Sequence, residues 1–311
     1  MRFRTLGRTG LRLSELTIGL CGRSDPRETS ATLALALARG VNAASIDAGD
    51  EAAVALLEQT IAQQGDREFH VLARATSLVP FDLPSPHVPA WQAYPGRHLR
   101  AETERLLAGL GIERLALLQL HAWCPEWLGE GDWLETLHRL RAEGKIAGFG
   151  VSLFDHDVRA ALQVVASSEI DAVQVIYNVF DQGAAAELLP LCGARGVGVV
   201  VRSPLYFGAL TSAFCRSQNF AADDWRHAYF YHQHRHETIE RARRINPVAG
   251  SGEDSLSDTA LRFSLSSGAV STVSVGMSRR EHLEANLAAI AEGELDTDHV
   301  AALRHHKWLS S

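Results

Sequence analysis

The feature that most constrains this chain is an alternation of short apolar runs with amphipathic segments, repeated eight times. Helical patterns such as Leu99–Ala108 and Leu134–Ala142 lie between the runs and usually end at a glycine. Eight strand–helix units predict an α/β fold in which parallel strands close into a (β/α)8 TIM barrel. The predicted strands are Leu16–Leu20, Ala43–Asp47, His70–Ala75, Ala116–His121, Ala147–Val151, Ala172–Ile176, Val197–Val201 and Val270–Val275, and the helix-ending glycines are Gly109, Gly144 and Gly196.

Three segments depart from this repeat. The opening FRTLGRTGLRL has a glycine turn between two short runs, which predicts a β-hairpin that closes the bottom of the barrel. Val79–Arg97, with five prolines, and Thr211–Ser257, after strand seven, exceed ordinary connections in length. We expect Thr211–Ser257 to form a lid over a substrate, with a helix near Arg235–Ile245. Its aromatic residues are Trp225, Tyr229, Phe230 and Tyr231. We expect residues 1–311 to form a single domain.

Composition and charge argue against several classes of protein. The net charge is −7 and no basic run stands out, so nucleic acid is not an expected partner. There is no stretch of 18 apolar residues and no apolar core near the N-terminus, so neither a membrane span nor secretion is expected. The four cysteines form no CxxC pair, as in a cytoplasmic protein with reduced thiols. The oligomeric state is left open.

In such barrels the reacting groups lie at the carboxyl ends of the strands. The residues at those positions are therefore the first candidates for any function. They are Asp47, Ala75, His121, Ser152, Asn178, Arg202 and Gly276.

Several stretches, in order, resemble the aldo-keto reductase superfamily over nearly the whole chain. They are RTLGRTGLRLSEL, LLQLH, LRAEGKIAGFGVS, VQVIYN, ELLPLCGARGVGVVVRSPLYFGAL and ALRFSLSSGAVSTVSVGMSRREHLEANL. The resemblance implies that NADP(H) lies across the top of the barrel. It also implies a catalytic set in which a tyrosine protonates the substrate carbonyl, a lysine and an aspartate support that tyrosine, and a histidine orients the substrate.

Two members of that set are expected in this chain. His121, at the end of LLQLH, matches the histidine. Asp47 is the expected aspartate, although a gapless match would place Ser45 in that slot and Asp50 in the slot of the tyrosine. A carboxylate that merely caps the next helix is the alternative for Asp47.

The other two members are absent. The tyrosine slot falls near Asp50 to Ala52, and the first tyrosine of the chain is Tyr94. Ala75 is expected in the lysine slot, which would turn Arg74 toward the surrounding helices, because side chains alternate along a strand. The only lysines, Lys145 and Lys307, are too far from this end of the third strand.

A carbonyl reductase without this tyrosine needs another proton donor. A positioned acid contributes roughly 10²–10⁴-fold in rate. The sequence offers His121, Asp50, Tyr229 and Tyr231 as candidates and does not choose among them.

The resemblance also implies a set of cofactor contacts. Ser152 and Gln174 match the positions that contact the nicotinamide carboxamide, and Arg279, followed by Arg280, suits a 2′-phosphate. The pyrophosphate loop would use Ser203, Leu205 and Gly208, and the adenosine end would use Gly276, Ser278 and Asn286. We therefore expect NADP(H) as the cofactor.

Two positions depart from the family pattern on the nicotinamide side. Leu153 stands where many relatives have asparagine, and Arg202 stands where many have an aromatic residue. A fixed positive charge at Arg202 would disfavour the oxidised, cationic ring. Alternatively, Arg202 binds an anionic substrate or forms an ion pair with Asp47 or Glu51.

No metal site is expected. His232, His234 and His236 alternate in HQHRH, but nothing nearby completes a ligand set, so a solvated lid segment is the preferred interpretation.

These observations favour a divergent, aldo-keto reductase-like enzyme. We expect His121, Asp47 and Arg202 to act on a small carbonyl- or hydroxyl-bearing metabolite, an anionic one among the candidates, with NADP(H) but without the usual mechanism. The alternatives are a non-redox lyase, dehydratase or isomerase on the same barrel, and a non-catalytic ligand-binding protein.

Overall fold

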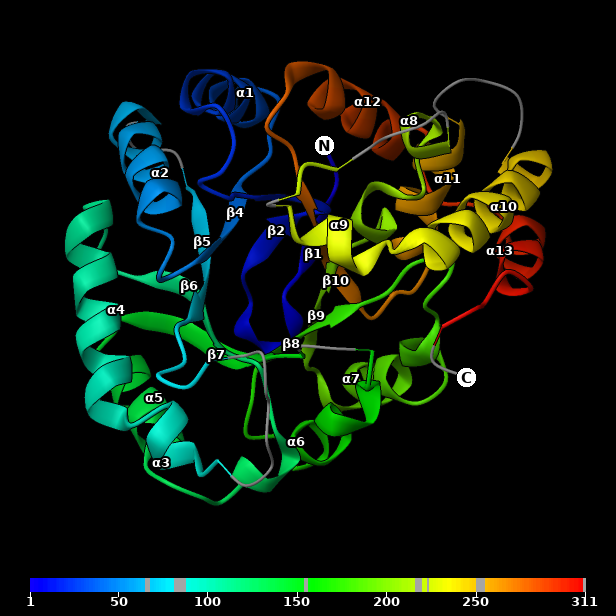
Figure 1. Ribbon diagram of the computed structural model, residues 1–311. Coiled ribbons are helices and arrows are strands. Elements are labelled where there is room, and N and C mark those ends of the chain that lie inside the picture. Colours follow the sequence, from blue (N-terminus) through cyan, green and yellow to red (C-terminus); the bar gives the residue numbers. More distant parts are fainter. Residues whose placement is uncertain are drawn as a thin grey trace.

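The eight predicted strands form a closed parallel barrel in the order β10-β3-β4-β5-β6-β7-β8-β9, as predicted (Figure 1). The computed structural model describes residues 1–64, 68–80, 88–153, 156–215, 220–222, 224–249 and 255–309. The barrel strands are β3 (Leu16–Gly19), β4 (Ala43–Asp47), β5 (His70–Ala75), β6 (Leu115–His121), β7 (Ile146–Ser152), β8 (Ala172–Ile176), β9 (Gly198–Arg202) and β10 (Val270–Gly276). Each lies within one residue, at either end, of its predicted range.

Helices surround the barrel (Figure 1). They are α1 (Pro26–Ala38), α2 (Glu51–Gln64), α4 (Gly96–Leu110), α5 (Trp133–Ala142), α6 (Leu162–Ala166), α7 (Leu188–Arg195), α11 (Ser255–Ser264), α12 (Arg280–Ala291) and α13 (Thr297–Arg304). The prediction that Gly109 ends its helix is wrong, because α4 runs through Gly109 and ends before Gly111. Gly111 has the left-handed φ of 64° typical of a helix C-cap. None of the helices in the described part of the chain has both the length and the apolar composition needed to span a bilayer.

The predicted N-terminal hairpin is confirmed and fixes which residues face the barrel interior. It consists of β1 (Phe3–Thr5) and β2 (Arg12–Ser14). A compact apolar cluster joins the hairpin to the inside of the lower barrel: Leu6, Leu13, Ala43, Leu72, Leu117, Ala172 and Val200. Because side chains alternate along each strand, every second residue above this cluster also faces inward. The inward residues at the mouth are therefore Asp47, Arg74, His121, Gln174 and Arg202.

The two long segments carry helices of their own. Val79–Arg97 contains α3 (Ala90–Ala93) and the start of α4, and its residues 81–87 lie outside the described residues. The lid segment contains α8 (Ser212–Cys215), α9 (Trp225–Tyr229) and α10 (His232–Ala249), and its residues 216–219, 223 and 250–254 also lie outside the described residues. The helix predicted near Arg235–Ile245 is thus confirmed as the middle of α10. This helix packs on α11 and α13 (Figure 1).

Candidate active site

Asp47 and Arg74 form a bidentate ion pair at the mouth of the barrel. Arg74 Nε lies 2.6 Å from Asp47 Oδ1, and Arg74 Nη2 lies 2.8 Å from Asp47 Oδ2. The prediction that Arg74 faces the helices is wrong. Ala75 instead packs in the buried layer between strands and helices, because Leu72 faces the interior and Arg74 shares its side of the strand. An arginine, rather than a lysine, is therefore the cation that pairs with Asp47 at the mouth.

The two alternatives to Asp47 have other partners. Ser45 lies inside the barrel, where its hydroxyl is 3.0 Å from that of Ser274. Asp50 precedes α2 and accepts hydrogen bonds from the backbone N–H groups of Gly22 and Ala53, at 2.8 and 3.0 Å. Of the three residues, Asp47 is the one that meets a cation at the mouth.

His121 ends β6 and faces the same mouth. Its Nδ1 lies 2.9 Å from the Ser152 hydroxyl at the end of β7. Burial, and then the positive charges of Arg74 and Arg202, lower the pKa of His121 to about 3. The imidazole is therefore neutral at physiological pH and offers a hydrogen bond rather than a stored proton.

This low pKa makes the unfolding free energy of the protein depend on pH in the acid range. The neutral form is favoured in the folded state, so the contribution of His121 is present above the unfolded pKa of 6.5 and is lost as pH falls toward 3. Between pH 7 and pH 4 the wild type should lose roughly 3 kcal/mol more unfolding free energy than His121→Asn. Urea unfolding of both proteins at the two pH values measures this difference, and equal losses would contradict the assigned environment.

Arg202 ends β9 and reaches across the mouth. Its Nη2 donates to the Leu153 carbonyl at 2.9 Å, so the side chain passes the end of β8 to reach the residue after β7. Asp47, one of the ion-pair partners considered for Arg202, is engaged by Arg74. The guanidinium groups of Arg74 and Arg202 thus both lie close enough to His121 to lower its pKa, and that of Arg74 is paired with Asp47. This arrangement favours an anionic ligand or a developing negative charge.

The residues predicted to bind the nicotinamide carboxamide lie side by side. Ser152 and Gln174 are paired in register on β7 and β8, and both side chains are buried. Gln174 Oε1 accepts a hydrogen bond from Gln119 Nε2 at 3.1 Å. Within the described residues, the buried Gln119 Oε1 has no hydrogen-bond partner. A primary amide placed here would meet an unsatisfied acceptor, which fits a carboxamide group.

The predicted pyrophosphate loop has an unusual backbone. Ser203, Tyr206 and Phe207 have left-handed φ values of 54°, 45° and 57°, a conformation that costs a non-glycine residue of order 1–3 kcal/mol. The Asn178 side chain donates to the Ser203 carbonyl at 3.0 Å, and the Tyr206 side chain is fully buried. The surrounding structure thus holds the loop in one shape, as a binding loop requires.

The predicted adenosine end is open. Gly276, at the end of β10, has neither a positive φ nor any atom within 4 Å of an added Cβ, so packing within the chain does not require glycine there. A ligand lying against this backbone would require it. Ser278 follows, Arg279 is exposed at the start of α12, Arg280 pairs with Glu284, and Asn286 is buried.

The predicted cofactor residues therefore follow four neighbouring strand ends, from β7 through β8 and β9 to β10. Their polar groups and open glycine fit a dinucleotide lying across this rim. Two residues of the site were missed by the sequence analysis, namely Arg74 and Gln119. Both follow from the alternation of side chains along their strands, counted from Leu72 and Leu117, once these two leucines are known to face the barrel interior.

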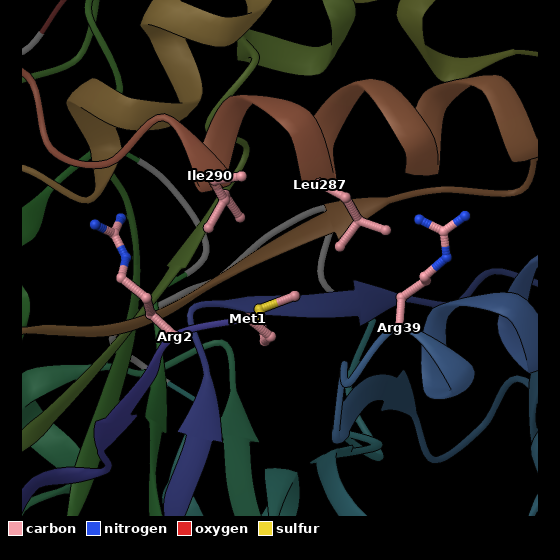
Figure 2. A pocket seen from close by; sticks show the side chains of 6 residues that line it. Met1, Arg2, Arg39, Leu287 and Ile290 are labelled. Carbon is pink, nitrogen blue, oxygen red and sulfur yellow. The ribbon is translucent and has the colours of Figure 1, made fainter.

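A separate hollow of about 330 Å³ lies at the other end of the molecule. Figure 2 shows Met1 between Arg2 and Arg39, beneath Leu287 and Ile290 of α12. These residues adjoin the N-terminal hairpin and the ends of α1 and α12 at the bottom of the barrel. The hollow is therefore not part of the candidate active site.

Comparison with known proteins finds relatives that are named as reductases or dehydrogenases. The chain is 27% identical over 204 residues to an NADH-specific methylglyoxal reductase of Escherichia coli, covering 64% of this chain and 61% of the relative. It is 30% identical over 194 residues to a D-threo-aldose 1-dehydrogenase of a Pseudomonas species, covering 60% and 55%. The matches thus span less than two thirds of these relatives.

Solved structures share the fold over the whole chain. The holo form of an aldo-keto reductase from Bacillus halodurans superposes with a TM-score of 0.77 at 19% identity, covering 99% of this chain and 96% of the other. The model of the aldo/keto reductase family matches residues 14–307. The chain therefore belongs to the aldo/keto reductase family.

Proposed function

We propose that this protein is an NADP(H)-dependent oxidoreductase that reduces a small 2-oxo acid. The observation that carries the proposal is that the side chains of Arg74 and Arg202 face the mouth of the barrel together with His121, Arg74 held by Asp47 and Arg202 by the Leu153 carbonyl. Carbonyl reduction develops negative charge on oxygen, and a 2-oxo acid brings a second negative charge in its carboxylate. Both charges suit this mouth.

Different residues of the site would bind the cofactor and the substrate. A reduced nicotinamide cofactor, when bound, supplies the hydride. Ser152 and Gln174 would hold its carboxamide, and Arg279 would pair with a 2′-phosphate. His121 donates a hydrogen bond to the substrate carbonyl oxygen, with its other ring nitrogen held by Ser152. Arg202 binds the carboxylate.

Arg74 has a supporting role in this mechanism. Its guanidinium is held by both oxygens of Asp47, so it does not move to follow the substrate. Its charge stabilises the oxyanion through space and keeps His121 neutral. Because guanidinium stays protonated, Arg74 does not donate the proton that the reduction consumes.

A matched pair of substrates tests the anionic preference. One relative is named as a methylglyoxal reductase, and pyruvate carries a carboxylate where methylglyoxal has its aldehyde. We expect kcat/KM with pyruvate to exceed that with methylglyoxal, measured as NADPH consumption by the purified protein. A clear preference for methylglyoxal would contradict the anionic substrate.

Cofactor binding is tested first and separately. Titration with NADPH should quench tryptophan fluorescence at micromolar concentrations, with NADH as the control for the 2′-phosphate and NADP⁺ as the control for ring charge. NADPH should bind more tightly than both. Binding of neither NADPH nor NADH at millimolar concentration would exclude hydride transfer and leave a non-redox enzyme or a ligand-binding protein, whereas binding of NADH alone would contradict only the preference for the 2′-phosphate.

A further inference from the structure

Five side chains above the barrel form a continuous hydrogen-bonded chain, called here the lid relay. Asp181 Oδ2 lies 2.5 Å from His156 Nδ1, and His156 Nε2 lies 3.4 Å from the Tyr229 hydroxyl. The Tyr229 hydroxyl lies 2.9 Å from that of Tyr206, which lies 3.0 Å from His234 Nε2. The residues come from three loops of the rim and from α9 and α10 of the lid.

The relay is anchored deep in the protein and reaches solvent at its histidines. Asp181 and Tyr206 are fully buried. His156 keeps 25% of its side-chain surface exposed and lines a surface pocket of about 500 Å³, and His234 is partly exposed. Tyr229 is also partly exposed and packs on Phe207 of the predicted cofactor loop, with ring centroids 5.0 Å apart.

The relay needs a proton on one of two histidine nitrogens. Three contacts in a row join His156 Nε2 to the Tyr229 hydroxyl, this hydroxyl to that of Tyr206, and the Tyr206 hydroxyl to His234 Nε2. Three hydrogen bonds need three protons, and the two hydroxyls supply only two. At least one of the two histidines must therefore present an N–H at Nε2. This happens either when His156 is doubly protonated beside the carboxylate of Asp181, or when His234 takes its Nε2–H tautomer. The two arrangements differ in the direction of every hydroxyl. A proton that leaves His156 Nε2 passes through Tyr229 and Tyr206 to His234 Nε2, and His234, which is partly exposed, then releases its Nδ1 proton to solvent.

Other candidates for the missing acid are unsuited to the role. His121 is neutral at physiological pH, and Asp50 accepts two backbone N–H groups at the start of α2. Tyr231 keeps 62% of its surface exposed and stacks on His234. Tyr94 is fully buried, and this burial raises the pKa of its hydroxyl far above its usual range. Tyr229 is partly exposed, and its hydroxyl is linked through His156 to the carboxylate of Asp181.

We propose that Tyr229 donates the proton that the reduction consumes and is reprotonated through His156, which Asp181 holds in place. This inference rests on the proposed function. The hydride adds to the carbonyl carbon, and the carbonyl oxygen takes the Tyr229 proton to give the alcohol. The Nε2 proton of His156 then passes to Tyr229, and solvent at the pocket restores it. Tyr206 and His234 orient the Tyr229 hydroxyl and are positioning residues.

Activity variants test the proton donor. Tyr229→Phe should lower kcat for pyruvate by roughly 10²–10⁴-fold, with NADPH affinity unchanged. The solvent deuterium isotope effect on kcat should be present in the wild type. Tyr231→Phe, two residues away and outside the relay, is the matched control and should keep both kcat and the isotope effect. If Tyr229→Phe keeps the wild-type kcat, Tyr229 is not the proton donor, and the proposed function is unaffected.

A second measurement does not depend on turnover. In the ¹⁵N NMR spectrum of histidine-labelled protein, His156→Gln should shift the ring nitrogens of His234, because the relay links their protonation. Tyr206→Phe should abolish this transmission, and Tyr231→Phe should preserve it. If the ¹⁵N signals of His234 are unchanged in His156→Gln, the two histidines are not linked through the relay and the proposed proton path is wrong. A wild type that binds NADPH but reduces no carbonyl compound would overturn the proposed function, and the donor role with it.

Discussion

Replacing Arg202 with leucine is expected to lower kcat/KM for pyruvate by roughly 10²–10³-fold. The physical reason is that a charge-assisted hydrogen bond to the carboxylate is lost in a partly buried site, where truncating one partner of a charge pair costs about 2–5 kcal/mol. Methylglyoxal lacks the carboxylate, so its kcat/KM should change by no more than about threefold. The comparison of the two substrates in one variant separates recognition from general damage.

The control for this experiment is an arginine at the other end of the cofactor path. Arg279 is exposed at the start of α12, and Arg279→Leu removes the same charge far from the mouth. It should weaken NADPH binding while leaving the ratio between the two substrates unchanged. If Arg202→Leu lowers kcat/KM equally for both substrates, Arg202 acts on the reaction or on the cofactor. The assignment of Arg202 to the substrate carboxylate would then be wrong.

The fold followed from the sequence because its signals are local. Each strand of the barrel is a short apolar run bounded by polar turns, and its helix carries a 3.6-residue pattern, so the order of elements suffices for the topology. The end of α4 was misplaced because Gly109 and Gly111 both fit a helix terminus. Only Gly111 takes the left-handed conformation, with φ of 64°, that ends the helix.

The error at Arg74 has a different physical origin. A parallel strand inside a barrel is buried on both faces, so HVLARA does not show by alternation which residues face the interior. A shift of one residue exchanges the two faces completely. The contact of Leu72 with the hairpin cluster decides the face, and that contact depends on a segment far away in the sequence.

The lid relay was beyond sequence reasoning for a related reason. His156, Asp181, Tyr206 and Tyr229 lie on four separate loops or helices, between 23 and 73 positions apart in the sequence for the pairs that touch. No local pattern marks them as partners. The density of aromatic residues in the lid did predict a folded covering segment, and Tyr229 was among the candidate acids, but the pairing with the rim required the closed barrel.

The tightest glycine of the barrel wall gives the largest expected effect on stability. Gly150 lies in β7, where an added Cβ would be 2.0 Å from the Ala172 carbonyl oxygen and 2.8 Å from its carbon. Both atoms belong to the backbone of β8, and the two strands are hydrogen-bonded in this register. Relief of the clash requires the strands beneath Ser152 and Gln174 to separate. Gly150→Ala should therefore lose more than about 4 kcal/mol of unfolding free energy.

Gly109→Ala is the matched control, because it is the same substitution where the structure leaves room. Gly109 lies inside α4 and nothing stands within 4 Å of an added Cβ. Alanine should stabilise the helix by about 0.5–1 kcal/mol, through the lower entropy of the unfolded chain. Urea unfolding of both variants measures the two signs. A destabilised Gly109→Ala would place the end of α4 earlier, and a tolerated Gly150→Ala would mean that β7 and β8 do not approach as closely as their register requires.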